Sequence, residues 1–176
     1  LPALPGAGSA LEYDGARYIY YLRGNSTTAL YRYDTQASAG SRWSALLAAA
    51  PGTIGAGGDA VFKGSYLYAT RGNTSVSFYR YDPSNNTWSD PAVADFAATN
   101  NFAADGFIVD GGGDNIYGCR ANNTATCYQY SITGNTWTQI TNAPANFTAG
   151  ASGASNKSDK FYAIAGAGTN TFSDGL

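Results

Sequence analysis

Three arginines of this sequence stand at equivalent places in a repeated segment, and each is followed by an Asn-x-Ser/Thr triplet. The segment reads RGNSTTALYRYD at 23–34, RGNTSVSFYRYD at 71–82 and RANNTATCYQYS at 120–131. Arg23, Arg71 and Arg120 could form a ring of guanidinium groups that grips carboxylates or acidic sugars. Alternatively, each arginine stacks on a neighbouring tyrosine or pairs with an aspartate. Because the arginines recur with the repeat, as core positions do, the structural role is favoured.

The asparagines of these triplets and three further ones are candidate acceptors for N-glycosylation. The six candidates are Asn25, Asn73, Asn85, Asn122, Asn146 and Asn156. In an antiparallel unit, Asn85 and Asn156 should lie on one face and the other four on the opposite face. Asn and Thr also favour turns, so the triplets can arise from turn formation alone. We predict that at least one of the six carries a glycan.

Cys119 and Cys127 are the only cysteines of the chain. They occupy the positions that Leu22 and Leu30 hold in the first repeat, and Thr70 and Phe78 in the second. If such positions face each other across a hairpin, a disulfide can replace an apolar cross-strand pair. Two free buried thiols are the alternative. We favour the disulfide, which predicts an oxidising, extracellular or cell-surface location.

Two other groups of residues could contribute to a binding site. DGGGDN at 110–115, with Asp105 upstream, is reminiscent of calcium loops, but it falls where a hairpin is needed, and a tight turn is the better interpretation. Most aromatic residues sit at repeating positions that should be packed. Tyr13, Phe96 and Phe102 do not, which leaves them as candidates for exposed contacts with a ligand.

Catalytic chemistry has little support in this sequence. The chain has no histidine, which excludes Ser-His-Asp triads, Cys-His pairs and the usual zinc and copper centres from this part of the protein. Glu12 has no partner carboxylate at a recurring spacing that would define a glycosidase pair. We therefore predict no catalytic residues, no metal site and no cofactor.

The composition restricts the possible partners. Of the 176 residues, 44% are apolar and 12% are charged, with a net charge of −2. Such a chain can bury a core. Without a basic stripe, nucleic acid is an unexpected partner. The longest apolar run, SALLAAAP at 44–51, is too short to span a membrane.

A period of about 48 residues organises the chain. Tyr20, Tyr68, Tyr117 and Tyr162 are separated by 48, 49 and 45 residues, and Trp43, Trp88 and Trp137 follow the three repeated segments. Alternating aromatic and polar residues, as in LYRYD, indicate strands with one buried face. Each unit is predicted to contain four antiparallel strands, of which the last bears the tryptophan. The fold class is therefore all-β.

The period, the YD of the third strand and the NTW of the fourth resemble the kelch-repeat β-propeller family. This resemblance covers the whole chain and implies about three and a half four-stranded blades, at 6–50, 51–98, 99–146 and, incomplete, 147–176. One departure is that RG, RG and RA replace the double glycine of kelch repeats. Since both ends fall within a blade, we expect either a longer chain or neighbouring subunits that supply the missing strands.

These observations predict a non-catalytic, secreted structural or adhesive glycoprotein of a microbial cell surface. It could polymerise into filaments with other copies of itself. The second interpretation is a carbohydrate- or protein-binding module of a larger extracellular protein. The third is part of an enzyme whose chemistry resides elsewhere in the chain. Fold alone does not choose among them, because propellers support unrelated functions.

Overall fold

A computed structural model describes residues 1–89, 93–96, 101–103, 105–158, 160–166 and 172–174 of the chain. These ranges contain fourteen strands and no helix, which confirms the predicted all-β class. It follows that the described part holds no helix that could cross a membrane.

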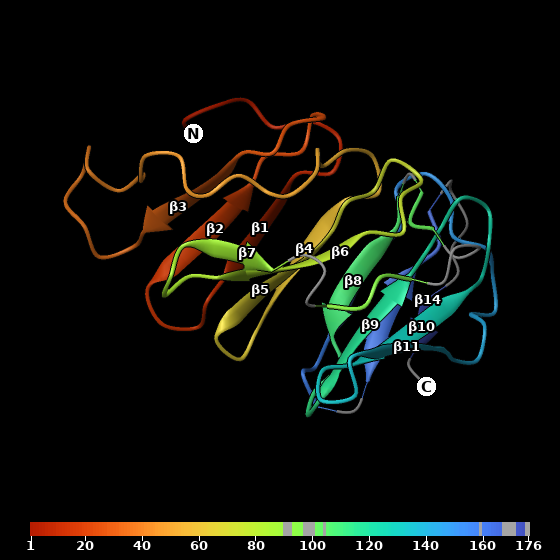
Figure 1. Cartoon of the computed structure of the whole chain (residues 1–176). Coiled ribbons are helices and arrows are strands. Elements are labelled where there is room, and N and C mark those ends of the chain that lie inside the picture. Colours follow the sequence, from red (N-terminus) through yellow and green to blue (C-terminus); the bar gives the residue numbers. More distant parts are fainter. Residues whose placement is uncertain (90–92, 97–100, 104, 159, 167–171, 175–176) are drawn as a thin grey trace.

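The strands form four antiparallel sheets, each built from strands that are consecutive in the chain (Figure 1). The first sheet contains β1 (Ala10–Tyr13), β2 (Tyr18–Leu22) and β3 (Leu30–Asp34). The second contains β4 (Asp59–Lys63), β5 (Tyr66–Thr70), β6 (Phe78–Asp82) and β7 (Thr87–Ser89). The third contains β8 (Phe107–Asp110), β9 (Asn115–Cys119), β10 (Cys127–Ser131) and β11 (Thr136–Gln139). The fourth contains β12 (Ser152–Ser155), β13 (Phe161–Ile164) and β14 (Phe172–Asp174).

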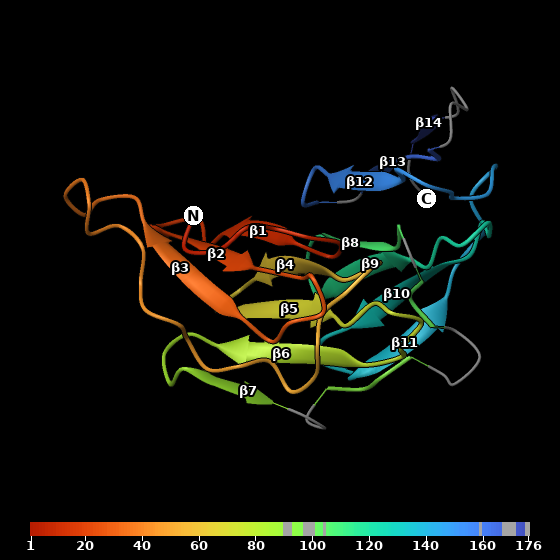
Figure 2. The same cartoon turned by 90° about the horizontal axis from the view of Figure 1, so that it is seen from above.

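The sheets follow one another in an arc, with the first strand of each sheet on the inner side (Figure 2). The innermost strands β1, β4, β8 and β12 contact one another in that order. Each sheet packs face to face on the next, which gives a propeller-like arrangement.

The prediction of four strands per unit is confirmed for the second and third sheets. In the first sheet, the expected strand around Trp43 is reduced to a single bridge between Trp43 and Tyr33, so the prediction is wrong there. The fourth sheet has three strands within the described residues.

A pair of residues in the NTW segment holds each of the middle sheets to the linker that precedes it. The side chain of Asn86 accepts a hydrogen bond from the Ala48 amide, and the Trp88 indole donates to the Ala48 carbonyl, both at 2.9 Å. Asn135 and Trp137 do the same to Ala94, at 2.7 and 3.0 Å. We call this arrangement the Asn–Trp clamp. It explains the recurrence of NTW, because both residues bind backbone of the preceding segment.

The hydrophobic core is divided into three clusters, one between each pair of neighbouring sheets. The cluster between the second and third sheets is the most aromatic. There, the rings of Trp137 and Phe96 stack with centroids 3.9 Å apart, and Phe78 contacts Trp137 at 5.0 Å. Aromatic side chains bury large areas, so these clusters supply most of the contact between sheets.

Candidate functional site

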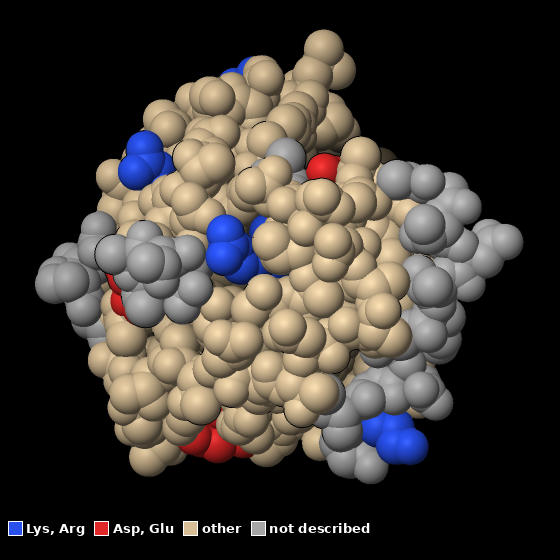
Figure 3. Space-filling view, turned by 90° about the vertical axis from the view of Figure 1, so that its right-hand side faces the viewer, with Lys and Arg blue, Asp and Glu red and all other residues tan. Residues whose placement is uncertain are grey.

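The inner strands line an open polar pocket of about 350 Å³. It is lined by β4, β8 and β12 with their flanking residues and by Glu12 of β1. Three carboxyl groups and one ammonium group contribute to its wall, namely Glu12, Asp59, Asp110 and Lys157. We call it the axial pocket. Charged side chains are otherwise sparse over the surface, as Figure 3 shows for one face of the molecule.

The carboxylates of the axial pocket connect consecutive sheets. Glu12 accepts a hydrogen bond from the Phe62 amide at 3.1 Å, which joins β1 to β4. Asp59 accepts one from the Ile108 amide at 2.9 Å, which joins β4 to β8. The carboxylate of Asp110 pairs with the Lys63 ammonium, and these two side chains are only 14% and 10% exposed. Inner strands are sheet edges, so Glu12 and Asp59 satisfy backbone donors that no strand pairs.

Burial raises the pKa of two of these carboxyl groups, Asp59 and Glu12. Burial raises the pKa of Asp59 to about 7, against hydrogen bonds from the Ile108 and Ala60 amides that favour the charged form. The residue keeps some exposed surface, but its carboxyl group is enclosed between the inner strands. Burial likewise raises the pKa of Glu12, opposed by the Phe62 amide and the Lys157 ammonium.

The axial pocket is suited to binding polar groups. Carboxylates accept hydrogen bonds from hydroxyl or ammonium groups, and Lys157 can donate one. No cluster of three or more metal-ligating side chains occurs in the described part of the chain. Glu12 has no partner carboxylate at a recurring spacing in the sequence, and this pocket was therefore not predicted. Its acids occupy non-equivalent repeat positions: Glu12 pairs with Tyr20, Asp59 with Thr70 and Asp110 with Ile116.

Each of the three repeated arginines donates a hydrogen bond to the segment before its own sheet, which is a structural role of another kind than the expected stacking on tyrosine or pairing with aspartate. The Arg23 guanidinium donates to the Leu4 carbonyl at 3.1 Å, and that of Arg71 to the Thr53 carbonyl at 3.4 Å. Arg120 donates to the Asn101 side chain at 3.4 Å. In each case the acceptor lies in the segment that leads into the arginine's own sheet. A ring of arginines that binds a ligand stays a hypothesis.

The three repeated sequons coincide with left-handed turns. In each copy, three consecutive residues have φ between 50° and 66°: 24–26, 72–74 and 121–123. Glycine and asparagine adopt this conformation most readily, which accounts for RGN and RAN. At Gly24 and Gly72, an added Cβ would also come within 2.5 Å of a linker carbonyl.

The hydroxyl residue of each repeated sequon also has a backbone role. Thr27, Ser75 and Thr124 each form an isolated bridge with the next linker, to Ile54, Phe102 and Phe147 respectively. The Thr27 and Thr124 hydroxyls also donate to the Gly24 and Ala121 carbonyls, both at 2.9 Å, so turn formation accounts for these triplets whether or not glycans occupy them.

All six sequon asparagines are exposed, as N-glycosylation requires. Asn146 donates to the side chain of Asn123 at 3.3 Å, which places it beside the turn of Asn122 as expected. Asn85 lies in the β6–β7 turn and donates to Asp82 at 2.9 Å. Glycosylation at these residues stays a prediction.

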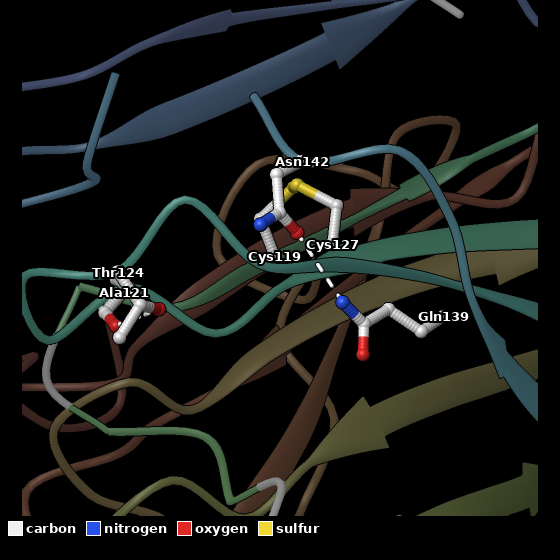
Figure 4. Close-up of a disulfide and its surroundings, with 6 residues drawn as sticks. All are labelled: Cys119, Ala121, Thr124, Cys127, Gln139 and Asn142. Atoms are coloured by element: carbon white, nitrogen blue, oxygen red, sulfur yellow. Dashed lines mark hydrogen bonds between the residues drawn. A yellow bond between two sulfur atoms is a disulfide. The ribbon is translucent and has the colours of Figure 1, made fainter. Parts of the chain in front are cut away.

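Cys119 and Cys127 form a disulfide with an S–S distance of 2.03 Å (Figure 4). The two residues are directly opposite in the β9–β10 pairing, as Leu22 and Leu30 are in the first sheet. Gln139 and Asn142 lie nearby and are joined by a hydrogen bond of 3.3 Å (Figure 4). The predicted pairing of the cysteines, and its place within the repeat, are confirmed.

The irregular aromatic residues were predicted to be exposed, and two of the three are not. Phe96 is 3% exposed and Phe102 is fully buried, because both pack against Trp137 between the second and third sheets. Tyr13 is 49% exposed, as predicted.

The DGGGDN segment forms the turn between β8 and β9, as predicted. The Gly111 amide donates a backbone hydrogen bond of 2.9 Å to the Asn115 carbonyl, which closes the turn. Its carboxylates bind protein groups: Asp110 pairs with Lys63, and Asp114 accepts from Ser131 at 2.8 Å.

Comparison with known proteins identifies the fold and not the activity. No family model matches the chain, and no curated protein does. Among solved structures, it is similar to the one described as "Structure of YjhT", with a TM-score of 0.70 and 20% sequence identity over 92% of this chain. The chain spans 58% of the length of that one. At this identity the likeness concerns the fold alone, and it agrees with a β-propeller-like arrangement.

Proposed function

We propose that the four sheets are blades of a kelch-like β-propeller and that the protein is a non-catalytic, secreted structural or adhesive glycoprotein of a microbial cell surface. The blade boundaries are those inferred from the period, 6–50, 51–98, 99–146 and 147–176. The proposal includes assembly with other copies of the chain, whose strands would complete the terminal blades.

The buried Cys119–Cys127 disulfide carries this proposal. Both cysteines are at most 1% exposed, and the bond replaces an apolar pair at the same repeat position. A buried disulfide of this kind is maintained in oxidising compartments. The exposure of all six sequon asparagines and the low charge suit the same location.

Fractionation of the native cells tests the location. Mass spectrometry of the natural protein, before and after glycan removal, then tests the modifications. We expect surface labelling of intact cells, a mass decrease on deglycosylation and no free thiols without reduction. A cytosolic protein with two free thiols and no glycan would contradict the proposal.

The axial pocket favours a second candidate, a module that binds polar ligands such as saccharides. Its carboxylates and Lys157 present acceptors and a donor within a volume of about 350 Å³. A glycan array with the natural protein and a Glu12→Gln variant tests this. Glutamine keeps an acceptor for the Phe62 amide, so loss of signal in the variant would indicate contact with the ligand. An array without hits for the natural protein would reject a saccharide.

A further inference from the structure

Two backbone amides of β12 face the axial pocket. In an antiparallel pair of strands, successive amides point alternately to the partner strand and to the open edge. The Asn156 amide donates to the Lys160 carbonyl at 3.1 Å, across the hairpin between β12 and β13. The amides of Gly153 and Ser155 therefore point away from β13, along the inner edge of the sheet, and both residues line the pocket.

The corresponding amides of β8 and β4 each have a carboxylate acceptor. Ile108 in β8 and Phe62 in β4 hold the same two positions of their strands as the two β12 residues do in theirs. Their amides donate to Asp59 and Glu12, at 2.9 and 3.1 Å. In both cases the carboxylate comes from the inner strand of the preceding sheet. A carboxylate is therefore the group that binds an inner-edge amide in this fold.

The sheet before β12 has apolar side chains at the positions of these carboxylates. Phe107 and Val109 of β8 stand where Asp59 stands in β4 and Glu12 in β1. They are 4% and 6% exposed and belong to the core cluster between the third and fourth sheets. Within the described residues, no side chain accepts a hydrogen bond from the two β12 amides. The carboxylate of a ligand can supply the missing acceptor.

The charged side chains divide the axial pocket into a donor side and an acceptor side. Lys157, in the turn after β12, adds an ammonium group beside the two amides. Glu12 and Asp59 place carboxylates on β1 and β4, whereas Asp110 is already paired with Lys63. A ligand with a carboxylate alone would be repelled by these acids, and one with an ammonium group alone would leave the amides without an acceptor. A ligand with both groups satisfies both sides.

We infer that the axial pocket binds a zwitterion, a small molecule with a carboxylate and an ammonium group, such as an amino acid. Its carboxylate accepts from the β12 amides and from Lys157, and its ammonium group donates to Glu12 and Asp59. A pocket of about 350 Å³ is in the size range of small-molecule sites. Further sheets of a longer chain would extend the arc and leave these groups facing the same pocket. This inference rests on the second candidate function, the binding of polar ligands, and narrows it to one class.

Isothermal titration calorimetry of the natural protein tests this inference. The probes are glycine, γ-aminobutyrate and ε-aminocaproate, whose two charged groups are progressively farther apart. Butyrate and butylammonium carry one charged group each and are the matched control ligands. Lys157→Gln and Glu12→Gln each remove one charge from one side of the pocket. Lys160→Gln is the control variant, because Lys160 is exposed in the same sheet and does not line the pocket. Circular dichroism checks that all variants are folded.

We expect at least one zwitterion to bind about tenfold more tightly than butyrate or butylammonium, because it forms charge-assisted hydrogen bonds on both sides. Lys157→Gln and Glu12→Gln should each weaken its binding about tenfold, and Lys160→Gln should leave it unchanged. Zwitterions that bind no more tightly than the control ligands, or pocket variants that bind like Lys160→Gln, would overturn the inference.

The glycan array separates this inference from the function on which it rests. Saccharide hits without zwitterion binding would leave the binding of polar ligands intact and overturn only the class of ligand. If neither saccharides nor zwitterions bind, both the inference and the second candidate function are wrong. Surface location and glycosylation, measured on the natural protein, decide the first proposed function separately.

Discussion

Trp88 and Trp43 occupy the same place in their repeats but have different surroundings. Trp88 lies in β7, donates to the Ala48 carbonyl and packs against Tyr81 with centroids 5.2 Å apart. Trp43 contacts Tyr33 at 5.1 Å, but its indole makes no equivalent hydrogen bond within the described residues. The first case has a regular strand, and the second has one bridge.

The difference teaches that the outer strand of a sheet depends on the preceding linker. Asn86 binds both the Ala48 amide and the Tyr81 hydroxyl, so one side chain joins the linker to β6. Ser41 stands at the corresponding place before Trp43, and the turn before it is longer: nine positions separate Asp34 from Trp43, against six from Asp82 to Trp88. Strand formation here is a tertiary effect more than a local one.

The largest loss of stability should come from truncating a tryptophan that belongs to an Asn–Trp clamp. Trp137→Ala removes the stack on Phe96 and the hydrogen bond to Ala94, and should lower the free energy of unfolding by about 3 kcal/mol. Trp43→Ala should cost about 1 kcal/mol, because the described residues give its ring contacts with Tyr21 and Tyr33 but no counterpart of the Phe96 stack or of the hydrogen bond to Ala94. Urea denaturation measures both. Equal losses would show that the clamp adds nothing.

The disulfide should have the next largest effect, and it distinguishes the third sheet from the first two. Replacing Cys119 and Cys127 by alanine opens a crosslink over a sequence separation of 8 residues. Chain entropy for so short a loop predicts a loss of roughly 2–3 kcal/mol. The control is the reduced natural protein, which lacks the bond but keeps the side-chain volume. If reduction alone has no effect on thermal unfolding, the stabilisation comes from packing.

A third difference separates the Asp59 carboxyl group in the axial pocket from the Asp34 carboxyl group, which forms an ion pair with Arg17 at the end of β3. Burial raises the pKa of Asp59 to about 7, whereas the Arg17 guanidinium lowers the pKa of Asp34 from 3.8 to about 2. A raised folded pKa gives stability that is present below about pH 4 and lost as the pH rises through 7. The lowered pKa of Asp34 gives stability that is present above about pH 4 and lost as the pH falls through 2.

Denaturation against pH checks this difference. The stability of the natural protein relative to Asp59→Asn should decrease between pH 4 and 7, by at most about 1.4 kcal/mol per pH unit. Relative to Asp34→Asn it should be constant over that range and decrease only in stronger acid. If the stability of the natural protein relative to Asp59→Asn does not change with pH, this carboxyl group is solvated.

The smallest effect is expected at a backbone position. Ala121 has a φ of 50°, where the first two repeats have glycine. Ala121→Gly should remove backbone strain and raise the free energy of unfolding by about 0.5 kcal/mol, since the lost methyl group offsets part of the gain. Gly72→Ala is the opposite change, and its Cβ would lie 2.5 Å from the Ala56 carbonyl. Thermal unfolding should therefore shift in opposite directions for the two variants.

Repetition made much of the fold predictable from sequence. The alignment of Cys119 with Leu22 and Thr70 placed the disulfide, because equivalent positions keep the same strand pairing. The same alignment set the order of strands in the middle sheets. The alignment could not predict which residues are buried at positions that do not repeat. Phe96 and Phe102 sit in linkers, and they become core residues because they pack against each other and against Trp137 between the sheets.

The axial pocket could not be read from the sequence for a related reason. Glu12, Asp59 and Asp110 come from three sheets and three different repeat positions, so no spacing marks them as a set. They meet because the inner strands converge. A pocket formed by convergence of separate sheets is a property of the assembled arc.

The disulfide also has a mechanical consequence for a chain that is pulled from its ends. The covalent bond bypasses the residues between Cys119 and Cys127. These residues therefore bear no load while the rest of the third sheet unfolds. At about 3.5 Å per extended residue, a separation of 8 residues spans roughly 28 Å, of which 4.1 Å is already spanned between the two cysteine Cα atoms, so the bond withholds about 24 Å of length. A tensile record of the oxidised protein should end short of that of the reduced protein by about this distance.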